Sequence, residues 1–202
     1  MSKSELITLP KGEAVYPALS RPDTKFNDLG TYKANVRLKV DEALPTIKKI
    51  QTIAKAHLGK AMPAKDNKVW KYETDEDGNE TGFVVFTIKV NNKLSKKTGK
   101  VWDRRPLVID GKKKEIPADV NVWGGSVIRV QVEVYPYNLP NKGINLQPTI
   151  VQVIELVTGG GKGDTSAFDE EDGYEGEEGS DADTSGFDSE GDGSADDSDV
   201  DY

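Results

Sequence analysis

The sequence predicts a mainly β body, folded as a small barrel or partly open sandwich with one helix, followed by a disordered acidic tail. Three observations predict this fold. Apolar and polar residues alternate along several segments, which is the period of a half-buried strand. Only one segment shows apolar residues at helical spacing. Turn signals separate about six or seven strand segments at short intervals, which favours a small β fold over an α/β fold.

Two segments are the clearest strands. In residues 31–40 every second residue is apolar, and the other face carries Lys33, Arg37 and Lys39. Residues 127–135 alternate in the same way, with Arg129 and Tyr135 on the polar face. Each segment is therefore expected to place one face on the core and one face in water.

Three further regions complete the expected strands. Residues 69–73 and 83–90 flank Asp77-Gly78, a pair typical of a hairpin turn. Residues 101–109 lie between two more turns. Residues 149–157 are apolar at nearly every position, which predicts a strand buried on both faces.

One helix is expected between the strand at 31–40 and the strand at 69–73. Apolar residues recur at helical spacing from Ile47 to Leu58. Pro45 suits a position in the first turn, and Gly59 is placed to cap the C-terminus.

The charge of the chain is divided into two parts. All 27 basic residues and 18 of the 35 acidic residues lie in residues 1–162, which gives this part a net charge of +9. Residues 163–202 hold the other 17 acidic residues and few large apolar ones, so they cannot bury enough surface to fold. We predict a folded domain at 1–158, a glycine hinge at 159–163 and a disordered acidic tail at 164–202.

The composition excludes several classes of function. The chain has no cysteine and one histidine, His57, which excludes thiol nucleophiles, thiolate zinc sites and histidine metal clusters. It has no phosphate-binding glycine motif. We expect no enzyme activity, no metal and no other cofactor. No apolar stretch approaches the roughly 18 residues of a membrane span, so we expect a cytoplasmic protein with no membrane partner.

Cations and aromatic residues occur together along the body. Lysine and arginine neutralise nucleic-acid phosphates, and an exposed aromatic ring stacks on an unpaired base. This combination predicts a binding surface for a single-stranded nucleic acid. The candidate residues are Lys33, Arg37, Lys39, Trp70, Tyr72, Lys93, Lys96, Lys97, Trp102, Arg104, Arg105, Arg129, Tyr135 and Tyr137. For Trp70, Trp102 and Trp123, a position in the core is an equal alternative, whereas Tyr32 and Phe86 share the phase of aliphatic residues and are expected in the core.

The tail carries the opposite charge to this surface. Its carboxylates and scattered aromatic residues imitate the charge and the stacking groups of a single strand. We predict that the tail occupies the cationic groove of the free protein and that DNA displaces it. Displacement would expose the tail end to a basic partner, and the candidate partner-binding residues are Phe187, Asp199, Asp201 and Tyr202.

The chain resembles the single-stranded DNA-binding proteins of short-tailed, T-odd-like phages. The resemblance rests on Gly30-Thr31-Tyr32-Lys33, on residues 120–137 with Tyr135-Pro136-Tyr137, on Ile154-Glu155-Leu156, and on a glycine hinge before acids that end at Tyr202. It implies an OB fold, here a five-stranded Greek-key barrel with insertions. It also implies sequence-independent binding of single strands in phage DNA replication, recombination, repair and strand annealing.

The same resemblance implies partners for the acidic tail. They are the phage DNA polymerase and the primase-helicase in the infected bacterial host cell, and the assembly that the resemblance implies is a homodimer. Two other interpretations stay open. An acidic-tailed chaperone or DNA mimic would bind basic proteins through the tail, and a module of cold-shock type would bind single-stranded RNA.

Overall fold

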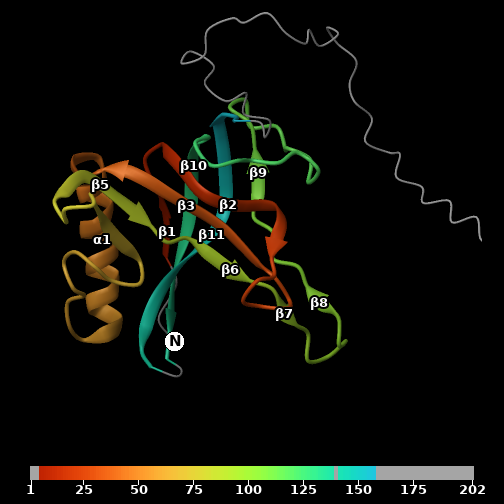
Figure 1. The fold of residues 1–202 in the computed structure, drawn as a ribbon. Helices are drawn as coiled ribbons and strands as arrows, with labels where there is room; N and C mark the ends of the chain where they lie inside the picture. Colours follow the sequence, from red (N-terminus) through yellow and green to blue (C-terminus); the bar gives the residue numbers. More distant parts are fainter. Residues whose placement is uncertain (1–4, 139–140, 158–202) are drawn as a thin grey trace, which may run out of the picture. The chain divides into compact units, whose positions relative to one another are not determined.

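The computed structural model describes residues 5–138 and 141–157. This part of the chain is mainly β with a single helix, as the periodicity predicts (Figure 1). The helix is α1 (Val40–Leu58). The strands are β1 (Glu5–Thr8), β2 (Gly12–Asp23), β3 (Thr31–Lys39), β4 (Trp70–Thr74), β5 (Glu80–Phe86), β6 (Lys89–Asn91), β7 (Lys93–Leu94), β8 (Val101–Trp102), β9 (Leu107–Ile109), β10 (Val127–Tyr137) and β11 (Gly143–Glu155).

Nine of these strands form one sheet in the order β4-β5-β3-β2-β10-β11-β9, with β1 paired to β10 and β6 paired to β3. β1 and β2 follow each other along β10, and between them the N–H of Leu9 donates to the Val130 oxygen at 2.9 Å. β5 and β6 follow each other along β3 in the same way. Between β5 and β6, Ile88 forms an isolated parallel bridge with Leu146 of β11. The series of neighbours β6-β3-β2-β10-β11 therefore returns to β6 through this bridge.

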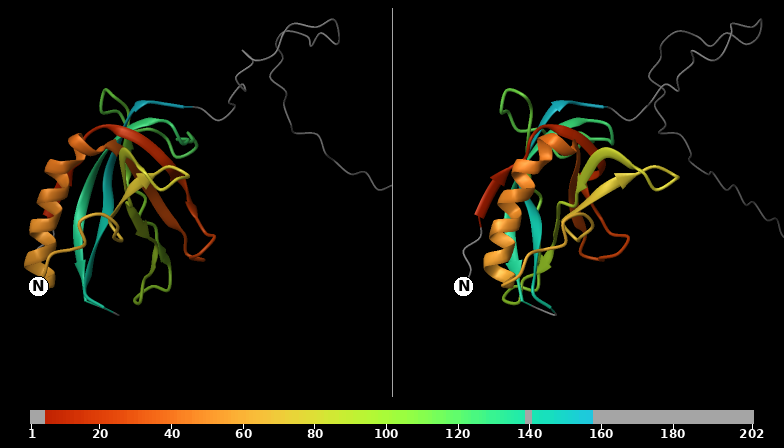
Figure 2. Two further views of the ribbon diagram at one scale, coloured as in Figure 1. Left: turned by 60° about the vertical axis from the view of Figure 1, so that its left-hand side comes forward. Right: turned by 90° about the vertical axis from the view of Figure 1, so that its left-hand side faces the viewer.

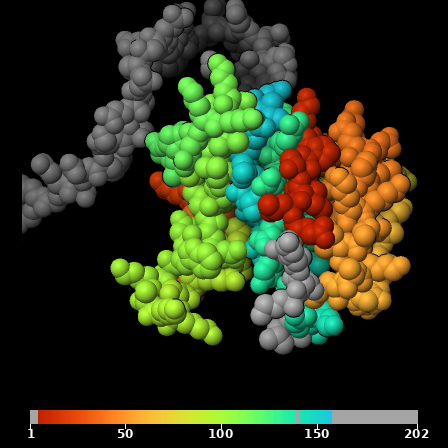
Figure 3. Space-filling view, turned by 180° about the vertical axis from the view of Figure 1, so that it is seen from behind, coloured from red at the N-terminus to blue at the C-terminus, as the bar shows by residue number. Residues whose placement is uncertain are grey.

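The core lies on the inner face of the sheet and under the helix. Val36 of β3 and Val132 of β10 are fully buried. Each lies at an apolar position of the alternation in its strand, so this burial agrees with the prediction. α1 packs against β3, β5, β10 and β11, and Figure 2 shows the helix beside β10 and β11. Its buried residues are Ala43, Thr46, Ile47, Ile50 and Ala54. In the view from behind (Figure 3), β1 is seen between α1 and the strands β10 and β11.

The helix begins earlier than predicted and ends as predicted. It starts at Val40, so Pro45 lies inside it rather than in the first turn. Proline there removes one backbone hydrogen bond, and acidic side chains in the first turn offset part of this cost through the helix dipole. At the other end Gly59 adopts a φ of 74°, and its N–H donates to the Lys55 oxygen at 2.9 Å.

The last strand is longer and more exposed than predicted. β11 spans Gly143–Glu155, and in its predicted part, from Thr149 onward, the buried residues lie between accessible ones. Val151 and Val153 are buried, whereas Ile154 is 37% exposed. The prediction of burial on both faces is wrong because, among the described residues, the core covers only one face of this part of the strand.

Local signals predicted the β4–β5 hairpin correctly. The Asp75 carboxylate accepts the Asn79 N–H at 2.7 Å, and Gly78 has a φ of 84°.

The expected strand at 101–109 is instead divided into β8 and β9 around Pro106, which has no N–H to donate. β1 and β2 were not predicted. In β2, irregular pairing near Tyr16, whose φ is 47°, interrupts the alternation.

Gly12 is required where β2 approaches β3. A Cβ at this position would lie 2.4 Å from the Arg37 oxygen and 2.5 Å from the Leu38 side chain. We expect Gly12→Ala to lower the free energy of unfolding by about 1–3 kcal/mol, because the backbone of β3 must move. Urea denaturation measures this loss, and Gly111→Ala, where a Cβ meets open space, is the control.

Parts of the predicted organisation lie outside the described residues. These are residue 158, the glycine hinge at 159–163 and the tail at 164–202, with the partner candidates Phe187, Asp199, Asp201 and Tyr202. The domain boundaries and the disorder of the tail therefore stay predictions. Within the described ranges, no helix combines the length and apolar character needed to cross a membrane.

Candidate nucleic-acid interface

Two of the predicted aromatic residues belong to the core. Trp70 is fully buried, its ring centroid lies 6.4 Å from that of Phe86, and its Nε1 donates to the Ala64 oxygen at 3.1 Å. Tyr72 packs against the same core from β4. Base stacking needs an accessible ring face, so the structure removes Trp70 from the candidate surface and weakens the case for Tyr72. Tyr32 and Phe86 are buried as predicted.

Arg37 is engaged by acidic side chains of the protein itself. Its Nε and Nη2 donate to the Glu73 carboxylate at 3.0 and 2.7 Å, and its Nη1 lies 3.3 Å from Glu13. Its guanidinium carbon lies 3.5 Å from the centroid of the Phe83 ring. The bond from Arg37, followed by one from Thr81, holds the pKa of Glu73 below its usual value. A DNA phosphate would have to replace these contacts, which makes Arg37 a weaker candidate than its strand position predicts.

Lys33 is paired with one carboxylate on the outer face of β3. It forms an ion pair with Asp23, and this bond, with the Lys25 N–H, lowers the pKa of Asp23. The cross-strand partner of Lys33 is Lys89 of β6. Like charges directly opposite each other repel, and Asp23 offsets this repulsion. A phosphate group at the same place would do so equally well.

The two adjacent arginines after β8 have different roles. Arg105 donates from Nε to the Leu19 oxygen at 2.8 Å, so it ties the loop to β2 rather than facing a ligand. Arg104 donates to the Gln147 side chain at 2.5 Å, and its guanidinium carbon lies 5.4 Å from the centroid of the Trp102 ring. Trp102 is 60% exposed, so this ring with a cation beside it remains a candidate for stacking.

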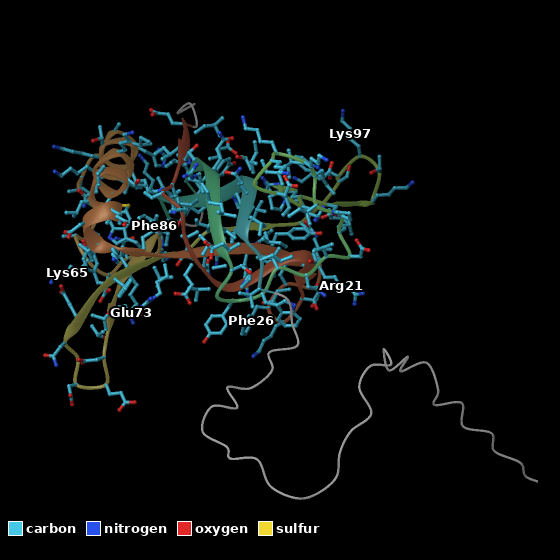
Figure 4. All side chains as sticks on the ribbon, turned by 90° about the horizontal axis from the view of Figure 1, so that it is seen from above. Arg21, Phe26, Lys65, Glu73, Phe86 and Lys97 are labelled. Carbon is cyan, nitrogen blue, oxygen red and sulfur yellow. The ribbon has the colours of Figure 1, made fainter. Side chains whose placement is uncertain are left out.

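The remaining predicted lysines are exposed. Lys39 is at the end of β3, just before α1. Lys93, Lys96 and Lys97 belong to β7 and to the turn that leads to β8, and Figure 4 shows Lys97 pointing away from the sheet.

The three predicted residues of β10 lie on its outer face, but Arg129 lies apart from the two tyrosines. Tyr135 is 37% exposed. Tyr137 covers Gly143, since a Cβ on this glycine would lie 2.2 Å from the tyrosine oxygen. The Tyr137 carbonyl is 3.1 Å from Nε2 of His57, which ties β10 to the end of α1. Arg129 precedes Tyr135 by six residues, or about 20 Å of strand, so it is separate from the tyrosines.

Strand pairing assembles a surface that we call the transverse band: Lys33, Lys68, Lys89, Arg104, Tyr135 and Tyr137. Lys33 faces Lys89 across β3 and β6, and Tyr135 faces Asn145 across β10 and β11. The Ile88–Leu146 bridge brings β6 beside β11. There, Lys68, Lys89 and Tyr137 line a cavity of about 470 Å³ together with Asn145. The band therefore runs across the strands rather than along one of them.

Sequence reasoning missed Lys68 and Lys89. Both are exposed, and neither is in an ion pair with a described residue. Lys89 lies at a polar position of the alternation in residues 83–90, so the sequence pattern could have predicted that it is exposed. Lys68 precedes β4 in an irregular segment, so only the tertiary structure brings it to the band.

Phe26 is a second residue that the sequence did not single out. It is 86% exposed in the loop between β2 and β3, with the Lys25 ammonium 5.5 Å from its ring centroid. Figure 4 shows this residue at the edge of the molecule. The loop leads into the end of β3 that carries Lys33, so Phe26 adds an accessible ring beside the transverse band.

The chain is similar in structure to gp2.5, a single-stranded DNA-binding protein encoded by bacteriophage T7. The match has a TM-score of 0.60 at 23% identity and covers 87% of this chain and all of the other. The chain has the fold of phage single-stranded DNA-binding proteins. This fold also matches the single-stranded DNA-binding protein of bacteriophage Enc34. Its C-terminal truncation gives a TM-score of 0.56 at 16% identity over 74% of this chain and 85% of that one.

A third matching structure is the Enc34 protein in complex with single-stranded DNA. It gives a TM-score of 0.55 at 16% identity and covers 74% of this chain and 86% of that chain. No family model and no curated protein matches the sequence. The likeness to these proteins is therefore one of three-dimensional fold.

Proposed function

We propose that this chain is a sequence-independent single-stranded DNA-binding protein that supports phage DNA replication, recombination, repair and strand annealing. The observation that carries the proposal is the transverse band, in which Lys68 and Lys89, two cations without a described carboxylate partner, lie beside the accessible tyrosines of β10. The proteins that share the fold, described as single-stranded DNA-binding, support it. No enzyme activity is part of the proposal.

We further propose that the sheet is an OB-type barrel with the helix inserted between its second and third strands. The strand series β6-β3-β2-β10-β11 and the parallel Ile88–Leu146 bridge support this assignment. A barrel of this type presents its outer strands and the loops beside them to a single strand. The transverse band and Phe26 occupy such positions.

The mechanism combines two interactions. Lysine and arginine neutralise phosphates and release counterions, so the affinity falls steeply as salt is added. Tyr135, Tyr137, Trp102 and Phe26 stack on bases, and each base stacked adds about 1–3 kcal/mol whatever its identity. Neither interaction reads base edges, which accounts for binding without sequence preference.

The acidic tail is proposed to regulate this binding. Its 17 acidic residues are attracted to a body that carries a net charge of +9. We propose that the tail competes with DNA for the cationic surface and, when displaced, recruits the phage DNA polymerase and primase-helicase. A homodimer is part of the same proposal.

The proposal is tested by fluorescence polarisation of labelled oligo-dT with the full chain and with a chain ending at Gly163. At low salt, the shortened chain should bind more tightly, and both should prefer single strands over a duplex. Equal affinity of both chains would contradict tail competition. Absence of binding by both would favour the acidic chaperone, and equal binding of the matching RNA would favour the RNA-binding module.

Asp23 offers a test of local competition for Lys33. We expect Asp23→Asn to raise the affinity for oligo-dT about threefold at low salt, because the freed lysine gains a phosphate contact. The same titration measures it, with Asp119→Asn, an exposed acid of the segment between β9 and β10, as the matched control. Unchanged affinity of Asp23→Asn would place Lys33 outside the DNA path.

A further inference from the structure

A second cavity continues the transverse band beyond Tyr137. It has a volume of about 240 Å³ and is lined mainly by apolar groups, among them Leu58, Met62, Val69, Tyr137 and Ile144. It shares Lys68, Tyr137 and Ile144 with the cavity that contains Lys89. The two cavities are therefore adjoining parts of one depression.

The walls of this cavity are held by hydrogen bonds. Asn67 donates to the Pro63 oxygen at 3.1 Å and accepts the N–H groups of Val69 and Trp70 at 2.8 and 3.1 Å. The Trp70 indole donates to Ala64 in the same segment. On the other wall, the Tyr137 side chain packs against Gly143, and the Tyr137 carbonyl oxygen contacts Nε2 of His57. These two contacts hold Tyr137 in place. A ligand would enter a preformed site and would not have to order these walls.

The charges around the cavity select an anionic ligand. Lys142 lines this cavity and Lys89 the adjoining one, while Lys68 lines both. None of the described residues that line either cavity is acidic. An apolar slot with an aromatic wall and lysines beside it matches one nucleotide, whose base is flat and apolar on its faces and whose phosphates are negative.

We infer that this cavity, the Tyr137 pocket, takes one unstacked base of the bound single strand, with its flanking phosphates at Lys68 and Lys142. The inference rests on the proposed function and adds a defined site to it. The remaining aromatic rings of the interface are open to solvent on one side, whereas a base in the Tyr137 pocket is enclosed by Met62 and Ile144 as well. The pocket then anchors the strand at one end of the band.

The test uses photo-cross-linking of the full chain to an oligo-dT that contains 5-iodouracil. A base in the pocket lies against Met62 and Tyr137, so cross-linked peptides should contain these residues. Gly143→Ala, which displaces the Tyr137 ring, should reduce the Met62 cross-link by about fivefold or more, the smallest effect expected from losing one stacked base.

A second variant fills the pocket. Met62→Trp should weaken oligo-dT binding by about fivefold in fluorescence polarisation, because one base loses its site. Leu6→Trp, at a residue of β1 that is 62% exposed in a different cavity, is the matched control and should bind as the unaltered chain does. Thermal unfolding of each variant checks that it is folded.

The outcomes separate the two proposals. If the unaltered chain binds oligo-dT but cross-links only through residues such as Trp102 and Phe26, or if Met62→Trp binds as tightly as Leu6→Trp, the pocket inference is wrong and the proposed function stands. If the unaltered chain does not bind single-stranded DNA, both are wrong.

Discussion

Replacement of Lys68 and Lys89 by glutamate is expected to weaken binding of oligo-dT on the order of 100-fold at low salt. Both lysines line the cavity beside Tyr137, and neither has a described carboxylate partner. The change removes two phosphate contacts and adds two repulsive charges within a Debye length of the strand. Fluorescence polarisation at several salt concentrations measures the loss.

The salt dependence gives a second, independent readout. The slope of log affinity against log salt should fall by about 1.4, because each phosphate contact to a single strand contributes about 0.7. Replacement of Lys112 and Lys114 by glutamate makes the same change of net charge in the turn after β9 and is expected to have a small effect. If both double variants lost affinity equally, the overall charge rather than the transverse band would control binding.

Substitution of Trp70 and of Trp102 by alanine should have opposite consequences. Trp70→Ala is expected to lower the free energy of unfolding by about 3–5 kcal/mol, because it opens a cavity against Phe86 and removes the bond to Ala64. Trp102→Ala should change stability by less than about 0.5 kcal/mol, since the side chain is 60% exposed. It should instead weaken oligo-dT binding about fivefold or more, through loss of one stacking surface.

Urea denaturation and polarisation titration of the two variants are sufficient to measure both effects. Each tryptophan variant serves as the control for the other, since the residue type is the same and only its position differs. A folded and stable Trp70→Ala protein with reduced DNA affinity would return Trp70 to the interface. A destabilised Trp102→Ala protein would place that ring in a structural role.

Short-range patterns predicted the regular parts of the body. The alternation in β3 and β10, the Asp77-Gly78 turn and the Gly59 cap each depend on residues close in sequence, so the sequence was sufficient for them. β2 was missed because irregular pairing at Tyr16 and two prolines interrupt its period. The helix start was misplaced because proline was assigned to its commonest position rather than to a second turn.

The candidate site was only partly predictable for a different reason. The sequence indicated which residue types bind a single strand, but not which of them are accessible or already paired. Arg37 meets Glu73, and Arg105 meets the Leu19 oxygen, across long separations in sequence. Lys89 joins the candidate interface because β6 lies beside β11, and Lys68, from the segment before β4, lines the same cavity.

By itself, then, the amino-acid sequence determined a mainly β body with one helix, the separation of positive and negative charge along the chain, and the absence of cysteine chemistry. The tertiary structure decided which aromatic rings are buried and which cations have no described carboxylate partner. It also decided where the exposed rings and these cations lie side by side. The physical reason is that strand period and charge are local properties, whereas burial and ion pairing depend on the strands that lie alongside.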